Sequence, residues 1–356
     1  MSLLEPKIFD RWLLEETPDS PVVVSSRARI ARTLSGQPFA SRANADQLGF
    51  IARRIADTFA RIPSLLRFTR YEMDKIPAED RCFLRESHLI SSDLEKGGAN
   101  RLVYLGPELD ASLMINEEDH LRLFTLVSGF RLLHAYDRLI HIEEDLEKEL
   151  ELAFTEEFGY LTACPTNTGT GLRLSVMLHL PALTMIEQIE VNLADLNSYG
   201  LVVRGAYGEN TENIGDLYQI SNEMTLGKSE EEILAILQRV VQQIVQREMY
   251  AREHLLREWR EKLEDVVCRA LGVLAAARRI DSLEAISLLS RIRLGIGQDW
   301  GVRLSHAALS RLFVQIQPAH LHCARRGTAT PQDRDQERAA LLRSIFGPGA
   351  AAAQEN

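Results

Sequence analysis

The sequence predicts an α+β fold, with an antiparallel sheet of about eight strands flanked by helices and followed by an all-α C-terminal domain. Three observations indicate this fold. Short β-type runs alternate with helical runs between residues 22 and 225, the β-type runs come mainly in adjacent pairs, and the pattern is purely helical after residue 227. Adjacent strands favour an antiparallel sheet over a doubly wound one, because parallel strands need a long crossover between them.

The expected strands are short runs rich in apolar and β-branched residues. They are residues 22–25, 101–105, 113–116, 120–127, 160–163, 173–180, 201–207 and 217–224. Two helical stretches, 130–152 and 183–196, interrupt them. We expect one domain over residues 1–252 that contains all of these elements.

The first helix after the sheet still belongs to the first expected domain. It begins at Ser229, where Ser229-x-x-Glu232 forms a capping box before a long apolar face. The second expected domain covers residues 253–356 and is helical. A second helix runs from about Asp281, where Asp281-x-x-Glu284 marks its start, to Leu294, with Gly295 at its end. A third begins with Thr330 and Pro331, and Gly347 follows its end.

Composition places the chain among ordinary globular proteins, since its 356 residues are 45% hydrophobic and 26% charged. No apolar run approaches the roughly 20 residues that span a bilayer, so we expect a cytoplasmic protein without a membrane partner. Residues 1–252 carry a net charge of −13 and residues 253–356 carry +3, which disfavours nucleic acid as a direct partner. The four cysteines are far apart, which predicts free thiols rather than disulfides or a zinc ribbon: Cys82, Cys164, Cys268 and Cys323.

Standard nucleotide-binding motifs are missing from the sequence. There is no G-x-x-x-x-G-K-[ST] segment, and Gly169-Thr170-Gly171 lacks the third glycine of a dinucleotide fingerprint. The H-R-D and D-F-G signatures of protein kinases are also missing. Any nucleotide must therefore bind through other residues.

An acidic run, Asn116-Glu117-Glu118-Asp119-His120, lies at an expected strand end. Three neighbouring carboxylates repel one another unless a cation is present, and that cation can be Mg²⁺ or a guanidinium group. A carboxylate paired with a guanidinium can orient it and accept its proton. The alternative is a solvated acidic turn.

A second unusual run, residues 162–171, leads from Cys164 into a loop of small residues that permits a ligand to approach the backbone. Cys164 alone is equally consistent with a small core residue. Five arginines lie in strand-like runs, and such guanidinium groups can neutralise a triphosphate without a P-loop. They are Arg27, Arg29, Arg122, Arg173 and Arg204.

Four motifs occur in a fixed order: S-S-R-x-R, N-E-E-D-H-x-R, C-P-T-N-x-G-T-G-x-R and R-G-x-x-G-E. Together they resemble the phosphagen kinases, the ATP:guanidino phosphotransferases, over about residues 20–250. The chain is most similar to the bacterial protein arginine kinases of this family. The large helical N-terminal domain of the metabolic members is missing, and a helical region with an R-D-x-x-R-A motif follows instead.

The resemblance implies a role for each matching residue. Glu118 would be the base that acts on the substrate guanidinium, with Glu209 as a second carboxylate and Cys164 as a thiolate beside them. Arg334, Asp335 and Arg338 would bind phosphoarginine at an allosteric site, with Arg334 and Arg338 on one helix face. The residues that would hold ATP are Ser25, Ser26, Arg27, Ala28, Arg29, His88, Arg122, Arg173, Leu174, Ser175, Val176, Met177, Arg204, Gly205, Ala206, Tyr207, Gly208 and Glu209.

The activity implied by the resemblance is transfer of the γ-phosphoryl group of ATP to arginine residues in proteins, which would mark them for stress response or degradation. ATP and Mg²⁺ would be required, and we expect no metal site built by the protein itself. The resemblance also implies a homodimer, an activating zinc-binding partner protein and a Clp-type protease system.

Three alternatives remain open at this point. The same site can serve a kinase of free arginine or of another small guanidino compound, although the missing N-terminal domain would leave the site open to protein-borne arginine. A non-catalytic adaptor that binds phosphoarginine is disfavoured because Glu118, Cys164 and Glu209 are all present. A helix-turn-helix over residues 298–312 is disfavoured by the small positive charge of the tail.

Overall fold

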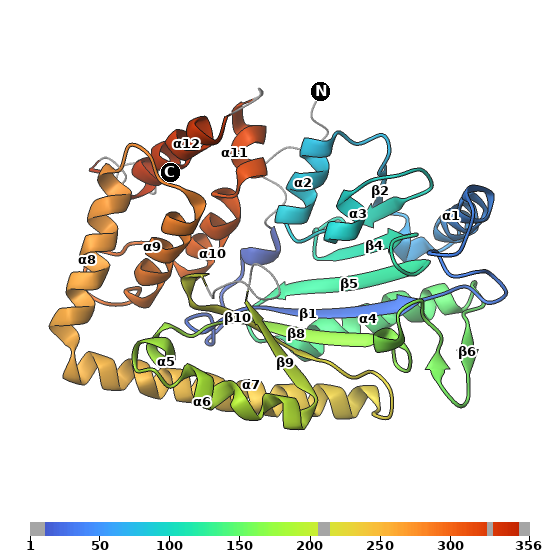
Figure 1. Ribbon diagram of the computed structural model, residues 1–356, viewed down its shortest axis with the longest axis horizontal. Helices are drawn as coiled ribbons and strands as arrows, with labels where there is room; N and C mark the ends of the chain where they lie inside the picture. Colours follow the sequence, from blue (N-terminus) through green and yellow to red (C-terminus); the bar gives the residue numbers. More distant parts are fainter. Residues whose placement is uncertain (1–10, 206–213, 326–329, 349–356) are drawn as a thin grey trace.

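The computed structural model describes residues 11–205, 214–325 and 330–348, which form a central antiparallel sheet covered by helices and flanked by a helical region (Figure 1). The sheet has eight strands in the order β2-β3-β4-β5-β1-β8-β10-β9. In that order the strands are β2 (Thr69–Glu72), β3 (Leu102–Leu105), β4 (Ala111–Ile115), β5 (Leu121–Ser128), β1 (Val23–Arg32), β8 (Leu172–His179), β10 (Leu217–Asn222) and β9 (Leu201–Gly205). The expected fold class is confirmed.

Seven of the expected strands overlap strands of this sheet. The expectation for 160–163 is wrong, because only Tyr160 is in a strand there. It belongs to β7 (Gly159–Tyr160), which pairs with β6 (Phe154–Thr155) in a separate two-stranded hairpin. The eighth strand, β2, lies at the sheet edge, and its residues are half-buried or exposed, so it carries little apolar signal.

One face of the sheet packs against three helices: α1 (Ala45–Phe59), α4 (Leu132–Glu147) and α7 (Glu230–Glu258). Alternate residues of β1, Ala28 and Ile30, point into this core because successive side chains of a strand point to opposite faces. The expected helix over 130–152 corresponds to α4. The expected helix over 183–196 is instead divided into α5 (Pro181–Met185), α6 (Ile189–Leu193) and η4 (Ala194–Tyr199), since Glu187 has a left-handed φ of 57°.

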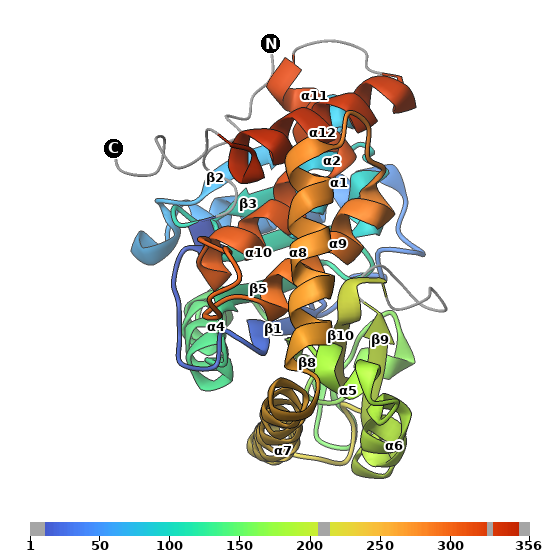
Figure 2. The ribbon, with the colours of Figure 1, turned by 90° about the vertical axis from the view of Figure 1, so that its left-hand side faces the viewer.

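The opposite face is covered in part by α2 (Ala78–Glu86) and α3 (Ser92–Glu95), and in part by the helical region. That region comprises α8 (Arg260–Ala276), α9 (Ser282–Leu294), α10 (His306–Gln315), α11 (Pro318–Arg325) and α12 (Pro331–Phe346). Figure 2 shows α8 in front, with α9 and α10 on either side of it. Short 3₁₀ turns connect the elements: η1 (Arg11–Leu13), η2 (Pro63–Leu65), η3 (Pro165–Asn167) and η5 (Ile214–Asp216).

The expected helix starts are confirmed at Ser229, Asp281 and Thr330, each of which accepts a hydrogen bond from the backbone three residues later. Helix α7 continues to Glu258, and the helical path breaks at Trp259. The expected division at residue 253 therefore falls within one continuous helix. Among the described residues, no helix is long and apolar enough to cross a membrane.

Candidate active site

Four arginines point from the sheet toward the face opposite the main core. Arg27 and Arg29 alternate on β1 with the buried Ala28 and Ile30. Arg29 lies opposite Arg173 of β8 in the strand register. Arg122 of β5 shares this face, since its neighbours Leu121 and Leu123 belong to the core on the other side. We call Arg27, Arg29, Arg122 and Arg173 the arginine face.

The arginine face is electrostatically unfavourable without an anion. Burial, and then the nearby charges of Arg122 and Arg173, lower the pKa of Arg27 to about 10. Burial, and then the charge of Arg122, also hold the pKa of Arg29 well below its usual range. Among the described residues, the buried Nε atoms of Arg27 and Arg29 have no hydrogen-bond partner. Phosphate oxygens would provide both the missing acceptors and the opposite charge.

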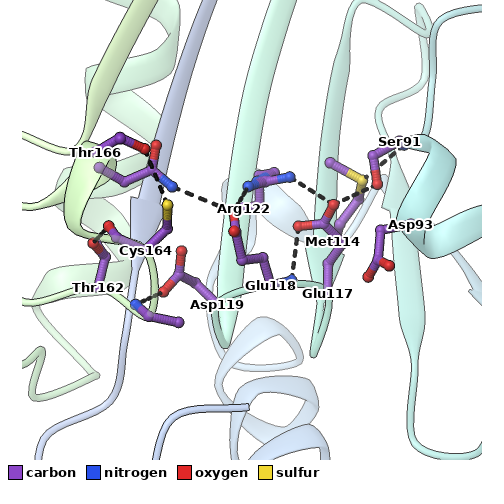
Figure 3. A network of polar contacts seen from close by, with 12 residues as sticks. Ser91, Asp93, Met114, Glu117, Glu118, Asp119, Arg122, Thr162, Cys164 and Thr166 are labelled. Atoms are coloured by element: carbon purple, nitrogen blue, oxygen red, sulfur yellow. Dashed lines mark hydrogen bonds and ion pairs between the residues drawn. The ribbon is translucent and has the colours of Figure 1, made fainter. Parts of the chain in front are cut away.

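The acidic turn between β4 and β5 meets the arginine face at Arg122 (Figure 3). Arg122 donates from Nη1 to Glu117 Oε1 at 2.6 Å and from Nη2 to Glu118 Oε2. Ser91 Oγ donates to the same Glu117 oxygen, so Glu117 is buried and fully engaged. The Glu118 side chain is 41% exposed, which leaves it accessible to a substrate.

The Cys164 loop is tied to the acidic turn by two hydrogen bonds, as Figure 3 shows. The backbone N–H of Ala163 donates to Asp119 Oδ1 at 2.6 Å, and Asn167 Nδ2 donates to Glu118 Oε2 at 3.4 Å. The Cys164 Sγ lies 3.0 Å from Thr166 Oγ1 and is half-buried. The thiol and the Glu118 carboxylate thus belong to two segments held together.

Close backbone contact behind this loop requires Gly169. Its φ is 111°, and a Cβ atom there would lie 2.2 Å from the carbonyl oxygen of Thr225. No other residue type fits that space. The Thr225 hydroxyl in turn donates to the carbonyl oxygens of Thr166 and Thr168, which fixes the loop to the chain after β10.

Two adjoining cavities open onto the site. The larger, of about 700 Å³, is lined by Arg29, Arg122, Glu117 and Glu118, together with Ser41 of the loop after β1. The smaller, of about 350 Å³, is lined by Arg27, His88, Ser175 and Met177 among others, and Ser92 borders both cavities.

His88 is an exposed residue at the edge of the smaller cavity, and its ring contacts Trp12 edge to face. Partial loss of hydration against the cavity, and then the charges of Arg27 and Arg85, lower the pKa of its imidazole below the ordinary value. These effects favour the neutral form of the imidazole.

The expected site residues are placed as follows. The structure brings together Glu118, Cys164, Ser25, Arg27, Arg29, His88, Arg122, Arg173, Ser175 and Met177 around the arginine face and its cavities. It places Ser26, Ala28, Leu174 and Val176 on the same strands but toward the opposite, buried face. Arg204 and Gly205 end β9, and Arg204 pairs in register with Gln219. Ala206, Tyr207, Gly208 and Glu209 lie outside the described residues.

The expected phosphoarginine residues lie on α12. Arg338 is buried and is 2% exposed, and its guanidinium donates to the carbonyl oxygens of Ile316 and Ile280 and to Asp335 Oδ1. Arg334 is half-buried. Arg338 is therefore engaged within the protein and does not project from an exposed face beside Arg334.

Sequence reasoning assigned no role to Asp119, Asn167 or Ser91, which hold the site together. Asp119 lies within the N-E-E-D-H run, so this motif could have indicated it. The sequence motifs also did not indicate the residues of α10 that line the smaller cavity, Phe313 among them. No local pattern marks these, because they meet the site only through the tertiary fold. Among the described residues, no group of three His, Cys, Asp or Glu side chains is placed to hold a metal ion.

This fold and site define a class of enzyme: a phosphotransferase that gathers a polyphosphate on a face of arginines beside a carboxylate suited to a cationic acceptor. A family model for the ATP:guanido phosphotransferase C-terminal catalytic domain matches residues 50–251. A second, for the C-terminal domain of the protein-arginine kinase McsB, matches residues 260–356.

Curated relatives agree along almost the whole chain. The protein-arginine kinase of Halothermothrix orenii is 41% identical over 338 residues, which cover 95% of this chain and 97% of that protein. The protein-arginine kinase of Moorella thermoacetica is 42% identical, with 94% and 97% covered. The protein-arginine kinase of Halalkalibacterium halodurans is 43% identical, with 94% of each covered.

Solved structures show the same fold. A lombricine kinase aligns with a TM-score of 0.58 and 26% identity, over 65% of this chain and 67% of that one. The duplicated taurocyamine kinase of Schistosoma mansoni, with bound transition state analog components, aligns with a TM-score of 0.59 and 27% identity, over 68% of this chain and 35% of that one. The chain belongs to the ATP:guanido phosphotransferase family, in its protein-arginine kinase branch.

Proposed function

We propose that this protein transfers the γ-phosphoryl group of ATP to the guanidinium group of arginine residues in proteins. The observation that carries the proposal is the position of Glu118. Its carboxylate is bound by Arg122 of the arginine face and also borders the open cavity of about 700 Å³. One residue therefore touches both the expected phosphate site and the expected acceptor site.

Glu118 acts on the acceptor. A guanidinium group with a pKa above 12 is not a nucleophile until a proton leaves and its charge is localised. The accessible Glu118 carboxylate can pair with the guanidinium, hold one nitrogen in line with the γ-phosphorus and accept the proton. Glu117 cannot take this role, because Arg122, Ser91 and the backbone N–H of Glu118 already occupy its oxygens.

The arginine face holds the phosphates. The unpaired Nε atoms of Arg27 and Arg29 fit a polyphosphate, since each guanidinium can bind two oxygens. Mg²⁺, bound mainly through phosphate oxygens and water, would supply further charge neutralisation. In a loose phosphoryl-transfer transition state such stabilisation provides most of the catalysis, so fixed arginines are more effective than mobile ones.

We propose that Cys164 acts on the same acceptor. The hydrogen bond from Ala163 to Asp119 sets the start of its loop beside the turn that carries Glu118. A thiolate there would add a second negative charge near the guanidinium. Glu209 stays proposed as a further carboxylate.

We extend the proposal to the biological setting. The product would mark proteins for stress response or degradation in the cytoplasm, with a zinc-binding activator and a Clp-type protease system as partners. A homodimer and allosteric binding of phosphoarginine through Arg334, Asp335 and Arg338 belong to the same proposal. The match of residues 260–356 to the McsB C-terminal domain supports it.

The test is incubation of the full chain with ATP, Mg²⁺ and a mixed protein extract, followed by phosphosite mapping at neutral pH. Neutral conditions matter because the P–N bond is expected to be acid-labile. We expect phosphoarginine on proteins and little turnover of free L-arginine in a parallel reaction. Sites confined to serine, threonine or tyrosine, or equally fast turnover of free arginine, would refute the proposal.

A further inference from the structure

The smaller cavity at the arginine face has walls from both parts of the chain. Strands β1, β8 and β10 contribute one side, which includes Arg27. The other side is contributed by the helical region. We call its four lining residues the α10 wall: Ser310, Phe313, Val314 and Gln317.

The lining of this cavity combines charged, apolar and hydrogen-bonding side chains. The charged ones are Arg27, Arg85 and Glu86. Trp12, Leu13, Ile90 and Leu126, with Phe313 and Val314 of the α10 wall, are apolar, and Ser25, Gln219 and Gln317 add hydrogen-bonding groups. A flat aromatic base with polar edges, linked to phosphates, matches this mixed lining, and the volume of about 350 Å³ is in the range of ligand sites.

The helical region also fixes the turn that carries His88. The backbone N–H of Ala319 donates to Glu86 Oε2 at 2.8 Å, and His320 Nε2 lies 3.2 Å from Ser87 Oγ. The His320 ring stacks on Phe83 with centroids 4.1 Å apart. His88 itself has a φ of 62°, a strained conformation for a residue with a Cβ that needs support from its surroundings.

Arg338 holds the chain directly after α10. Its Nε donates to the carbonyl oxygen of Ile316, the C-cap residue of α10, at 2.9 Å. Gln317 follows directly, and its amide nitrogen donates back to the carbonyl oxygen of Phe313. The position of the wall therefore depends on packing within the helical region.

We propose that the α10 wall binds the base of ATP, with Phe313 and Gln317 in contact with it, so that nucleotide affinity depends on the docking of the helical region onto the sheet. The inference rests on the proposed function, because it takes ATP as the occupant. A base between β1 and α10 would be recognised by residues more than 280 positions apart in the chain.

The test is calorimetric titration of the full chain with two probes, Mg·ADP and Mg·pyrophosphate. We expect Gln317→Ala and Phe313→Ala each to weaken Mg·ADP binding by about 5- to 30-fold, the usual cost of losing a well-packed contact. Pyrophosphate binding should stay within about twofold of wild type, because pyrophosphate lacks the base. Gln315→Ala is the matched control, since Gln315 is the last residue of α10, two positions before Gln317, and does not line the cavity.

Phe313 is only 8% exposed, so its loss can also destabilise the helical region. Gln317→Ala removes no core contact, so it still tests whether the α10 wall contacts the base if Phe313→Ala unfolds. Unchanged Mg·ADP affinity in Gln317→Ala, or an equal loss for pyrophosphate, overturns the inference. If the variants behave as expected but wild type phosphorylates no arginine, the proposed acceptor is wrong and the α10 wall stands.

Discussion

Arg27 should weaken the ligand-free fold while it strengthens nucleotide binding. Its guanidinium is mostly buried, is repelled by Arg122 and Arg173, and has an Nε without a partner among the described residues. The substitution Arg27→Gln removes the charge and keeps a polar side chain. We expect the variant to be more stable than wild type without ligand and to gain less stability from nucleotide.

The magnitude follows from the pKa. A fall in the pKa of Arg27 from its ordinary value to about 10 corresponds to about 3 kcal/mol of penalty on the charged form in the folded state. The Arg27 guanidinium also lies over the Phe124 ring, 3.9 Å from its centroid, and this cation–π contact stabilises wild type by about 1 kcal/mol. The glutamine variant lacks that contact. The variant should therefore gain about 2 kcal/mol in free energy of unfolding.

The sign of the pH dependence is fixed by the same shift. A base with a lowered pKa in the folded state is penalised while it is charged, so the penalty is fully present below about pH 10 and is lost only as the pH rises through that value. The stability gain of Arg27→Gln should therefore be the same at about pH 6 and about pH 8.

The assay is urea unfolding with and without Mg·ADP at 100 times the wild-type dissociation constant. Wild type should gain about 2.7 kcal/mol from the ligand, and a variant that binds tenfold more weakly should gain about 1.4 kcal/mol. Arg269→Gln is the control, because that side chain is 78% exposed and should change neither quantity. A variant that is less stable than wild type and keeps the full gain from Mg·ADP would refute this account of the arginine face.

Three further substitutions test the supports of the site. Asp119→Ala leaves the N–H of Ala163 without its acceptor, and we expect a loss of about 1–3 kcal/mol in unfolding free energy and a lower kcat; unchanged kcat would remove Asp119 from the positioning of Cys164. Gly169→Ala forces a Cβ against the Thr225 carbonyl, so unfolding should occur at lower urea concentration, and a normal midpoint would contradict the geometry. Arg338→Ala removes the donor to two buried carbonyl groups and should lower the free energy of unfolding by about 2–4 kcal/mol, so its phosphoarginine binding must be compared with wild type at the same folded fraction. An unchanged free energy of unfolding would contradict the structural role of Arg338.

Local patterns predicted most of the sheet because its strands have clear sequence signals. β1 and β8 are mostly buried, with their more accessible arginines on one face, and β5 is buried throughout and largely apolar around Arg122. The helix expected over 183–196 failed because a single left-handed residue, Glu187, interrupts an otherwise apolar periodicity. No composition rule marks a glutamate for that conformation.

The residues of the site were likewise predicted only in part from the sequence. Motifs identified Glu118 and the arginines, since the chemistry of a guanidinium acceptor and a polyphosphate demands those residue types. They did not show that Arg338 is buried, because it bonds to the backbone carbonyls of Ile280, before α9, and of Ile316, directly after α10, which are far from it in the sequence. The α10 wall was likewise invisible, since Phe313 looks like any core residue until the helical region is placed against the sheet.

The central claim is that Glu118 acts on the acceptor while the arginine face holds ATP, and Glu118→Gln separates the two. Protein-arginine phosphorylation and Mg·ADP affinity should be measured on the same preparation, with Glu157→Gln, a change at an exposed residue of the β6–β7 hairpin, as the matched control. The account predicts a kcat lowered by about 10²- to 10⁴-fold with Mg·ADP affinity nearly unchanged. A near-normal kcat in Glu118→Gln would contradict it and would move the base to another residue.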